Sequence, residues 1–101
     1  MIFYEVTVEL DAEKAAELSP AFENYMRQKH IPEIYATGCF MHIRFDKASD
    51  HLFRTCYLAN TQDDYERYIR DYAPAFRADF MQHFPTGCSP SRLVFSDLQT
   101  W

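Results

Sequence analysis

The sequence predicts an α+β domain in which two helical segments cover one face of a four-stranded antiparallel sheet. Three observations support this fold class. Residues 1–10 alternate between apolar and polar side chains, as a half-buried strand does. Residues 12–30 and 61–84 repeat apolar side chains at spacings of three and four, as amphipathic helices do. Residues 39–46 and 51–60 are two strand-like stretches with no helical pattern between them.

The first strand has one face directed at the core. Its inward set is Ile2, Tyr4, Val6, Val8 and Leu10, and its outward set is Phe3, Glu5, Thr7 and Glu9. A chain of 101 residues is large enough for one two-layer core, so we expect a single domain over residues 1–101. Aromatic residues make up 17% of the chain, which indicates a bulky core, an aromatic-lined cavity or an apolar interface.

The first helical segment is predicted to follow Asp11, which suits an N-cap. Ser19 and Pro20 then predict a restart, with Ser19 as the cap and Pro20 at the first helical position. The restarted helix is expected to end at His30, because Pro32 disfavours helical geometry at the residue before it.

A rigid corner is predicted to connect this helix to the second strand. Pro32 suits the start of a short helical turn, and Gly38 suits its left-handed end. The strand is expected over residues 39–46. Its alternation places Met41, Ile43 and Phe45 on one side and Phe40, His42 and Arg44 on the other.

Residues 47–50 are polar and predict a hairpin loop, with the partner strand over residues 51–60. Two registers are possible for this strand. Its outward side chains are either Phe53, Thr55 and Tyr57 or Leu52, Arg54 and Cys56.

The second helical segment is predicted to start at Thr61, a hydroxyl cap followed by carboxylates that suit the helix dipole. Its apolar stripe is Tyr65, Ile69, Tyr72, Phe76, Phe80 and then His83 or Phe84. Pro74 interrupts the hydrogen-bond ladder and predicts a kink or a break. Residues 85–90 predict a loop, and residues 92–101 a last strand.

This element order is the ferredoxin-like βαββαβ order of a two-layer sandwich. Right-handed crossovers place the first and third strands in the centre of the sheet. The helices leave one face of the sheet open, and the alternation gives that face large aromatic and ionisable side chains. A solvated face rarely keeps so many aromatic residues, so we expect a second copy of the chain to cover it in a homodimer.

Charge and composition exclude several classes of partner. The net charge is −5 and there is no run of Lys or Arg, so we expect neither nucleic acid nor an anionic membrane as a partner. No apolar run approaches membrane-spanning length, and no signal-peptide pattern opens the chain. The cysteines, Cys39, Cys56 and Cys88, are odd in number and widely spaced, which favours a reducing cytoplasm over a disulfide scaffold.

Several stretches of the chain resemble the uncharacterised bacterial domain-of-unknown-function family numbered 4286. They are residues 2–8, the His-Ile-Pro-Glu and Ala-Thr-Gly-Cys-Phe sequences within residues 26–40, residues 64–68, and the Ala-Pro pair at 73–74. The family is similar to the dimeric α+β barrels, which include small monooxygenases and isomerases. The resemblance implies a ferredoxin-like protomer that pairs through its open sheet face, and it implies no activity. The chain departs from the family at Ser19 and Pro20, where an uninterrupted helix is usual.

His30 is the first candidate for chemistry. At the mouth of a pocket between helix and sheet it would act as a general acid or base, or bind an anion. The alternative is a structural histidine that caps carbonyl groups at the end of a helix.

A second candidate site lies on the open face, where Glu5, His42, Arg44, Tyr57 and Arg54 are predicted to converge on a small polar or anionic ligand. The alternative is a set of ion pairs within a dimer interface. The tyrosines Tyr25, Tyr65, Tyr68 and Tyr72 either supply hydroxyl groups to a pocket or, as an aromatic stripe at helical spacing usually does, belong to the core. His83 is interpreted as a partly buried core residue, and Cys39 as a small buried residue in preference to a reactive thiol. No metal-ligand spacing, phosphate-binding loop or nucleophile motif is present, and we expect no cofactor.

Two functions follow from these residues. The first is a cytoplasmic homodimer that binds a small molecule or serves as an interaction module. The second is a cofactor-independent monooxygenase- or isomerase-like enzyme acting on a small aromatic or cyclic substrate, in which His30 or His42 moves a proton, Arg44 holds negative charge and Tyr57 donates a hydrogen bond. An enclosed cavity that brings either histidine within reach of Arg44, Glu5 or a tyrosine favours the enzyme.

Overall fold

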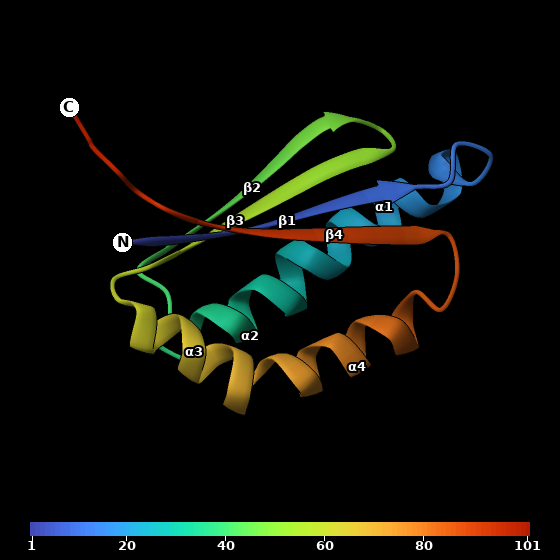
Figure 1. Ribbon diagram of the computed structural model, residues 1–101. Coiled ribbons are helices and arrows are strands. Elements are labelled where there is room, and N and C mark those ends of the chain that lie inside the picture. The colour runs from blue at the N-terminus through green and yellow to red at the C-terminus, as the bar shows by residue number, and fades with distance from the viewer.

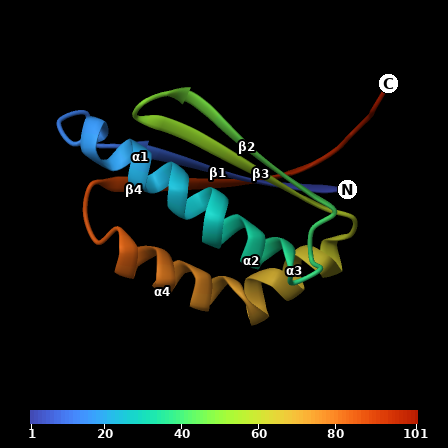
Figure 2. The same ribbon diagram turned by 180° about the vertical axis from the view of Figure 1, so that it is seen from behind.

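The structure is a computed structural model that describes residues 1–101. In chain order its elements are β1 (Ile2–Leu10), α1 (Ala15–Tyr25), the π-helical turn η1 (Met26–His30), α2 (Ile31–Tyr35), β2 (His42–Ser49), β3 (Leu52–Ala59), α3 (Gln62–Asp71), α4 (Ala73–His83) and β4 (Cys88–Ser96). The four strands form one antiparallel sheet in the order β2-β3-β1-β4. All helices lie on one face of this sheet and the other face is uncovered (Figures 1 and 2). The predicted fold class and the central positions of the first and third strands are confirmed.

The first strand has the predicted faces. Ile2, Tyr4, Val8 and Leu10 are buried, whereas Glu9 is exposed. β1 pairs with β3 on one side and with β4 on the other, so it runs through the middle of the molecule.

The first helical segment is more continuous than predicted. It begins at Ala15 without a side-chain cap, and Pro20 lies inside α1, so the expected cap at Asp11 and the restart at Ser19 are wrong. The predicted end at His30 is wrong as well, because η1 connects α1 to α2 without a break. A π-helical turn is wider than an α-helical one, and this one ends two residues before Pro32, whose ring would otherwise crowd the carbonyl four residues earlier.

The corner after α2 places Phe40 differently from the prediction. Gly38 has the left-handed φ of 76° expected at the end of a helix. β2 starts only at His42, and Phe40 is buried with its ring 4.8 Å from that of Tyr68, so its predicted place on the open face is wrong. His42 and Arg44 do lie on the open face, and Ile43 between them in the strand points inward.

The register of the β2–β3 hairpin decides which side chains of β3 point inward. The predicted loop at residues 47–50 is shorter in the structure, because β2 continues to Ser49. Phe53, Thr55 and Tyr57 are each at most 2% exposed and face the helices. The open face therefore receives Leu52, Arg54, Cys56 and Leu58.

The second helical segment follows the prediction closely. The Thr61 Oγ1 accepts a 3.1 Å hydrogen bond from the backbone N–H of Asp64, which caps α3. Pro74 falls in the first turn of α4, and the segment divides at Tyr72 into α3 and α4. None of the helices combines the length and the apolar character needed to cross a bilayer.

The last strand lies earlier in the chain than predicted. β4 runs from Cys88 to Ser96 instead of over residues 92–101, and the expected loop shrinks to the residues before Cys88. Gly87 makes this tight entry possible, because its φ is 89° and a side chain there would meet Leu18. Arg92 and Val94 consequently lie beside inward-facing residues of β1, and Leu93 and Phe95 lie beside outward-facing ones.

The core between the layers is divided into two clusters. One surrounds Phe22, which has no exposed surface and contacts the rings of Phe53, Phe80 and Phe84. The other cluster lies toward α3 and contains Tyr4, Tyr57 and Tyr68 together with Ile34 and Phe40. Val6 packs against both clusters. The space between them is where the candidate site lies.

Candidate functional site

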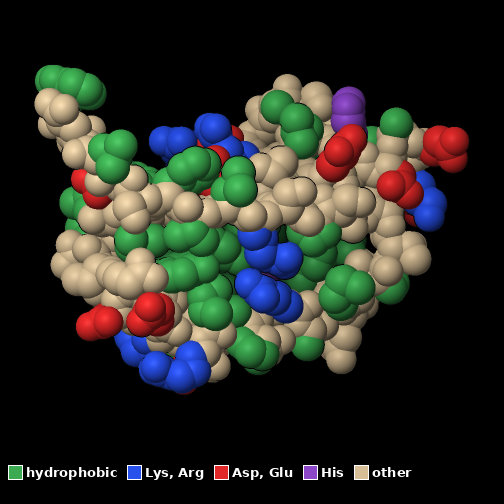
Figure 3. Space-filling model, viewed as in Figure 1, with side chains coloured by type: hydrophobic (Ala, Val, Ile, Leu, Met, Phe, Trp, Pro, Cys, Tyr) green, Lys and Arg blue, Asp and Glu red, His purple; other side chains and the backbone are tan.

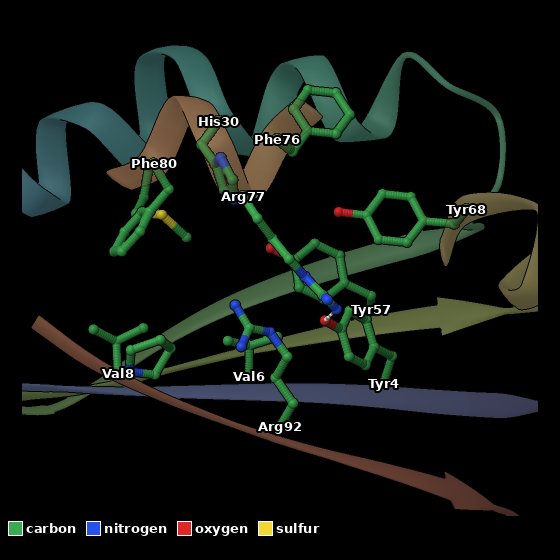
Figure 4. A pocket seen from close by; sticks show the side chains of 12 residues that line it. Tyr4, Val6, Val8, His30, Tyr57, Tyr68, Phe76, Arg77, Phe80 and Arg92 are labelled. Atoms are coloured by element: carbon green, nitrogen blue, oxygen red, sulfur yellow. Dashed lines mark hydrogen bonds between the residues drawn. The ribbon is translucent and has the colours of Figure 1, made fainter. Parts of the chain in front are cut away.

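A pocket opens between the inner face of the sheet and the helices η1, α3 and α4 (Figure 4). It is lined by Tyr4, Val6, Val8, Met26, His30, Tyr57, Tyr68, Phe76, Arg77, Phe80, Pro90 and Arg92. The space inside measures about 40 Å³, which holds a few water molecules. Its walls are mainly hydrophobic, and the polar groups that reach it are hydroxyl, imidazole and guanidinium groups.

His30 is mostly buried and its tautomer follows from its neighbours. The Tyr25 hydroxyl donates a 2.7 Å hydrogen bond to Asp79 Oδ2, so its oxygen is left to accept. His30 Nδ1 lies 3.3 Å from that oxygen and must therefore carry the proton. The Nε2 atom, which makes no hydrogen bond within the chain, then has a free lone pair. His30 is thus arranged as a proton acceptor.

Burial keeps the His30 ring neutral. Loss of hydration lowers the pKa of His30 to about 4, although the negative charges of Asp79 and Glu33 oppose this effect. The ring also packs edge-on against Phe76, with ring centres 6.0 Å apart. At pH 7 the site therefore contains an uncharged imidazole.

Asp79 holds this arrangement together from the outer side. It accepts hydrogen bonds from the Tyr25 hydroxyl and from Lys29 Nζ at 3.1 Å, and Lys29 also pairs with Glu33. These hydrogen bonds lower the pKa of Asp79, the one from Tyr25 having the larger effect. The orientation of Tyr25, and through it that of His30, depends on this carboxylate.

Three tyrosines form one wall of the pocket. The Tyr4 ring centre lies 5.5 Å from that of Tyr57 and 6.2 Å from that of Tyr68. Burial raises the pKa of both Tyr57 and Tyr68 above the ordinary value for tyrosine. Their hydroxyl groups stay protonated at neutral pH and are able to donate hydrogen bonds.

Two arginines stand at the mouth of the pocket. Arg77 comes from α4 and donates a 3.2 Å hydrogen bond from Nη2 to the Tyr4 hydroxyl, and Arg92 comes from β4 (Figure 4). Basic side chains also stand out at the centre of this side of the molecule, between β4 and α4, with hydrophobic side chains on both flanks (Figure 3). Neither arginine forms a salt bridge.

The predicted convergence on the open face is only partly present. Glu5 and Arg44 are both register partners of Cys56, and His42 lies at the edge opposite Leu58. Arg44 is committed to Asp46 at 3.0 Å, and Arg54 bonds the same carboxylate at 2.9 Å. Tyr57 points to the opposite face of the sheet, so its predicted place among these residues is wrong.

The structure therefore brings together different residues from those predicted. His30 and Tyr57 share the inner pocket, whereas Glu5, His42 and Arg44 lie on the other side of the sheet. Sequence reasoning missed Arg77 and Arg92, together with the role of Tyr4 as a pocket-lining residue. A signal for Arg92 was present, because strand alternation places it on the same face as Val94.

The remaining ionisable candidates do not form a separate centre. No group of three or more His, Cys, Asp or Glu side chains converges as metal ligands would. His83 is exposed instead of partly buried, and its Nδ1 lies 2.9 Å from the Asp79 carbonyl oxygen. Cys39 is buried, as expected.

The fold and the pocket define a ferredoxin-like α+β protein with a mainly hydrophobic cavity between its two layers, into which a few polar groups project. Comparison with family models identifies the chain more closely. Residues 1–97 match the model described as a domain of unknown function, DUF4286, and the chain belongs to that family. The predicted family resemblance is confirmed. A search of curated proteins found no match.

Solved structures with the same fold include two named as oxygenases. The monooxygenase from the gene ActVA-Orf6 of Streptomyces coelicolor, in complex with nanaomycin D, is 11% identical with a TM-score of 0.70, covering 99% of this chain and 89% of that one. SnoaB, a cofactor-independent oxygenase from Streptomyces nogalater, is 12% identical with a TM-score of 0.68, over 98% and 94% of the two chains. A dimeric ferredoxin-like protein from an uncultured marine organism is 10% identical with a TM-score of 0.69, over 99% and 97%. At these identities the likeness concerns the fold alone.

Proposed function

We propose that the protein binds a small organic molecule in the pocket between its sheet and its helices. One observation carries this proposal: hydrophobic walls enclose hydroxyl, imidazole and guanidinium groups from six different elements around a single cavity. Mostly apolar concave sites with a few converging polar groups are the usual form of small-molecule sites. Solved structures named as oxygenases, one of them in complex with nanaomycin D, support the same use of this fold.

Filling the cavity tests the proposal. Val6 lines the pocket without being fully buried, so Val6→Phe adds a ring to the cavity at a cost of about 1–3 kcal/mol in stability. We expect small aromatic molecules to shift the backbone amide NMR signals of pocket residues in the wild type and not in this variant. Equal shifts in both proteins would place the binding site elsewhere. The dispersion of the amide spectrum shows whether the variant is folded.

We further propose that the protein is a homodimer that pairs through the open sheet face. Leu58 lies beside Phe3, and Phe3 lies beside Phe95, which gives this face an apolar row across β3, β1 and β4 that ends at His42 of β2. In the protomer Phe95 is 48% exposed, and Leu93 in the next row is 63% exposed. A second copy would cover both, and the solved structure named as a dimeric ferredoxin-like protein supports this assembly.

Two charge substitutions of similar exposure test the dimer. Leu93→Asp places a carboxylate within the proposed interface, and Met81→Asp places one on the helix layer, where the side chain is 54% exposed. By sedimentation at micromolar concentration we expect the wild type and Met81→Asp to have twice the protomer mass and Leu93→Asp the protomer mass. A monomeric wild type would refute the proposal.

The compartment we propose is the cytoplasm. All three cysteines are free, and burial, followed by the charge of Glu5, raises the pKa of the Cys56 thiol. Free thiols are maintained in reducing compartments. Fractionation of cells that express the natural chain tests this location.

A cofactor-independent enzyme is the second candidate function. The observation that favours it is His30, which lines the cavity as a neutral ring whose Nδ1 contacts Tyr25 and whose Nε2 is free. A positioned neutral imidazole accepts a proton from a substrate hydroxyl or an acidic C–H group, a step that a monooxygenase and an isomerase have in common. His42, the other histidine considered, lies on the opposite face of the sheet.

Two assays distinguish this enzyme from a binding protein. Oxygen uptake with a panel of phenols and hydroquinones detects a monooxygenase, and deuterium incorporation from solvent into a panel of cyclic ketones detects proton abstraction. We expect His30→Gln to abolish either activity and His42→Gln to leave it unchanged. Equal rates for wild type and His30→Gln would exclude His30 as the base.

A further inference from the structure

The two arginines at the pocket mouth both lack a carboxylate partner. Most of the chain's lysines and arginines, Lys29 and Arg54 among them, contact a carboxylate. Arg77 and Arg92 have no such partner although they approach the same cavity from opposite layers (Figure 4). Two like charges at one pocket mouth repel each other, and an anion between them would relieve that repulsion.

The groups beneath the arginines also favour negative charge. No Asp or Glu lines the pocket. The Tyr4 hydroxyl accepts from Arg77, so its own proton is free to be donated elsewhere. Burial raises the pKa of Tyr68 and the charges of Arg77 and Arg92 act against that rise, which indicates that both positive charges are felt at its hydroxyl.

We propose that Arg77 and Arg92, with the Tyr4 hydroxyl, form a subsite for the carboxylate of a small aromatic acid whose ring enters the pocket. This inference rests on the proposed binding function and names its ligand class. Guanidinium groups bind carboxylates through paired, charge-assisted hydrogen bonds. The aromatic and aliphatic walls behind them suit an unsaturated ring.

A carboxylate fits the mouth better than a phosphate group does. Phosphate sites commonly use backbone N–H groups of a helix N-terminus or a glycine loop. Arg77 lies in the second turn of α4, and neither Gly38 nor Gly87 lines the pocket. The cavity of about 40 Å³ is smaller than the roughly 150 Å³ of a cavity that binds benzene, so binding of a six-membered ring requires the exposed Arg77 and Arg92 side chains at the mouth to move.

Three probes of related shape test the subsite on the whole chain. Benzoate carries the ring and the charge, benzamide carries the ring without the charge, and inorganic phosphate carries charge without a ring. Dissociation constants are measured by NMR titration at fixed ionic strength, from the amide signals of pocket residues such as Val6 and Phe80. We expect benzoate to bind at least tenfold more tightly than benzamide, and more tightly than phosphate.

Matched variants connect the charge preference to the two residues. Arg77→Gln and Arg92→Gln should each weaken benzoate binding about tenfold while leaving benzamide binding unchanged. Arg27→Gln, which removes an exposed cation away from the pocket, should change neither.

Three results would overturn the inference. Equal binding of benzoate and benzamide would remove the anion subsite while leaving the pocket as a binding site. Tighter binding of phosphate would overturn the choice of a carboxylate. Pocket signals that respond to none of the three probes would refute the inference, and Val6→Phe would then be tested against the wider panel to judge the proposed function separately.

Discussion

The burial of His30 predicts a specific loss of stability in mild acid. Its pKa is lowered from the ordinary 6.5 to about 4 in the folded protein, so folding excludes a proton that the unfolded chain binds. The contribution of His30 to stability is therefore complete above pH 6.5 and is lost as the pH falls from 6.5 toward 4. At pH 4.5 the two pKa values correspond to a loss of about 2.5 kcal/mol relative to pH 7.5.

A variant without the His30 ring separates the contribution of His30 to this loss of stability from the contribution of the carboxylates, which titrate in the same pH range. His30→Gln keeps an N–H donor for the Tyr25 hydroxyl oxygen and takes up no proton. Urea unfolding at pH 7.5 and 4.5, at one protein concentration because the proposed dimer would contribute to stability, gives the two free energies of unfolding. We expect the wild type to lose about 2.5 kcal/mol more than His30→Gln over this range. His51→Gln, which removes an exposed histidine at the β2–β3 turn, should lose as much as the wild type.

An equal loss in wild type and His30→Gln would refute the reasoning. It would mean that His30 binds a proton as readily in the folded as in the unfolded state. The lowering of the His30 pKa by burial, from which the prediction is worked, would then have no support.

Two further predictions concern the framework of the pocket, and urea unfolding measures both. Phe22→Ala should lower the free energy of unfolding by about 3–5 kcal/mol, because the ring has no exposed surface and contacts four other aromatic rings. The control Met81→Ala, on the helix surface, should lower it by less than about 0.5 kcal/mol. Gly87→Ala should lower the free energy of unfolding by about 2 kcal/mol, because a Cβ at this left-handed φ would approach Leu18 Cδ1 to 2.6 Å. Gly38→Ala should lower it by about 1 kcal/mol, because Gly38 has a similar φ but no atom near the position of the Cβ. Equal costs for the two glycines would show that Leu18 moves aside freely.

The fold could be predicted because its main signals are local. Alternation in β1, the Thr61 cap and the break near Pro74 each follow from a few neighbouring residues. The errors arose where a distant contact overrides the local pattern. Pro20 and Pro32 resemble helix breaks, yet the helix passes through both, because packing of its inner face and the π-helical turn compensate for the missing backbone donors.

The candidate site was harder to predict because it depends on which face of each strand points inward. Tyr57 was placed with Glu5 and His42 because two registers of β3 were possible, and the pairing of Tyr57 with the inward Tyr4 decides between them. Arg77 and Arg92 are far apart in the chain, and only the packing of α4 near β4 brings both side chains to the same pocket. His30 was recognised, whereas its proton-directing contact with Tyr25 needed the π-helical turn that brings residues five apart together.

Strand alternation also separates the two surfaces that the proposals use. Tyr4 lines the pocket and the adjacent Glu5 lies on the open face, and the same holds for Tyr57 and Cys56. A dimer through the open face would therefore leave the mouth between α4 and β4 uncovered, since Arg92 points to the inner side while Leu93 points to the outer one. Neighbouring residues of one strand thus serve different proposals, one residue facing the pocket and the next facing the dimer interface. The pocket variants and the interface variants accordingly report on different events even where they differ by one position in the chain.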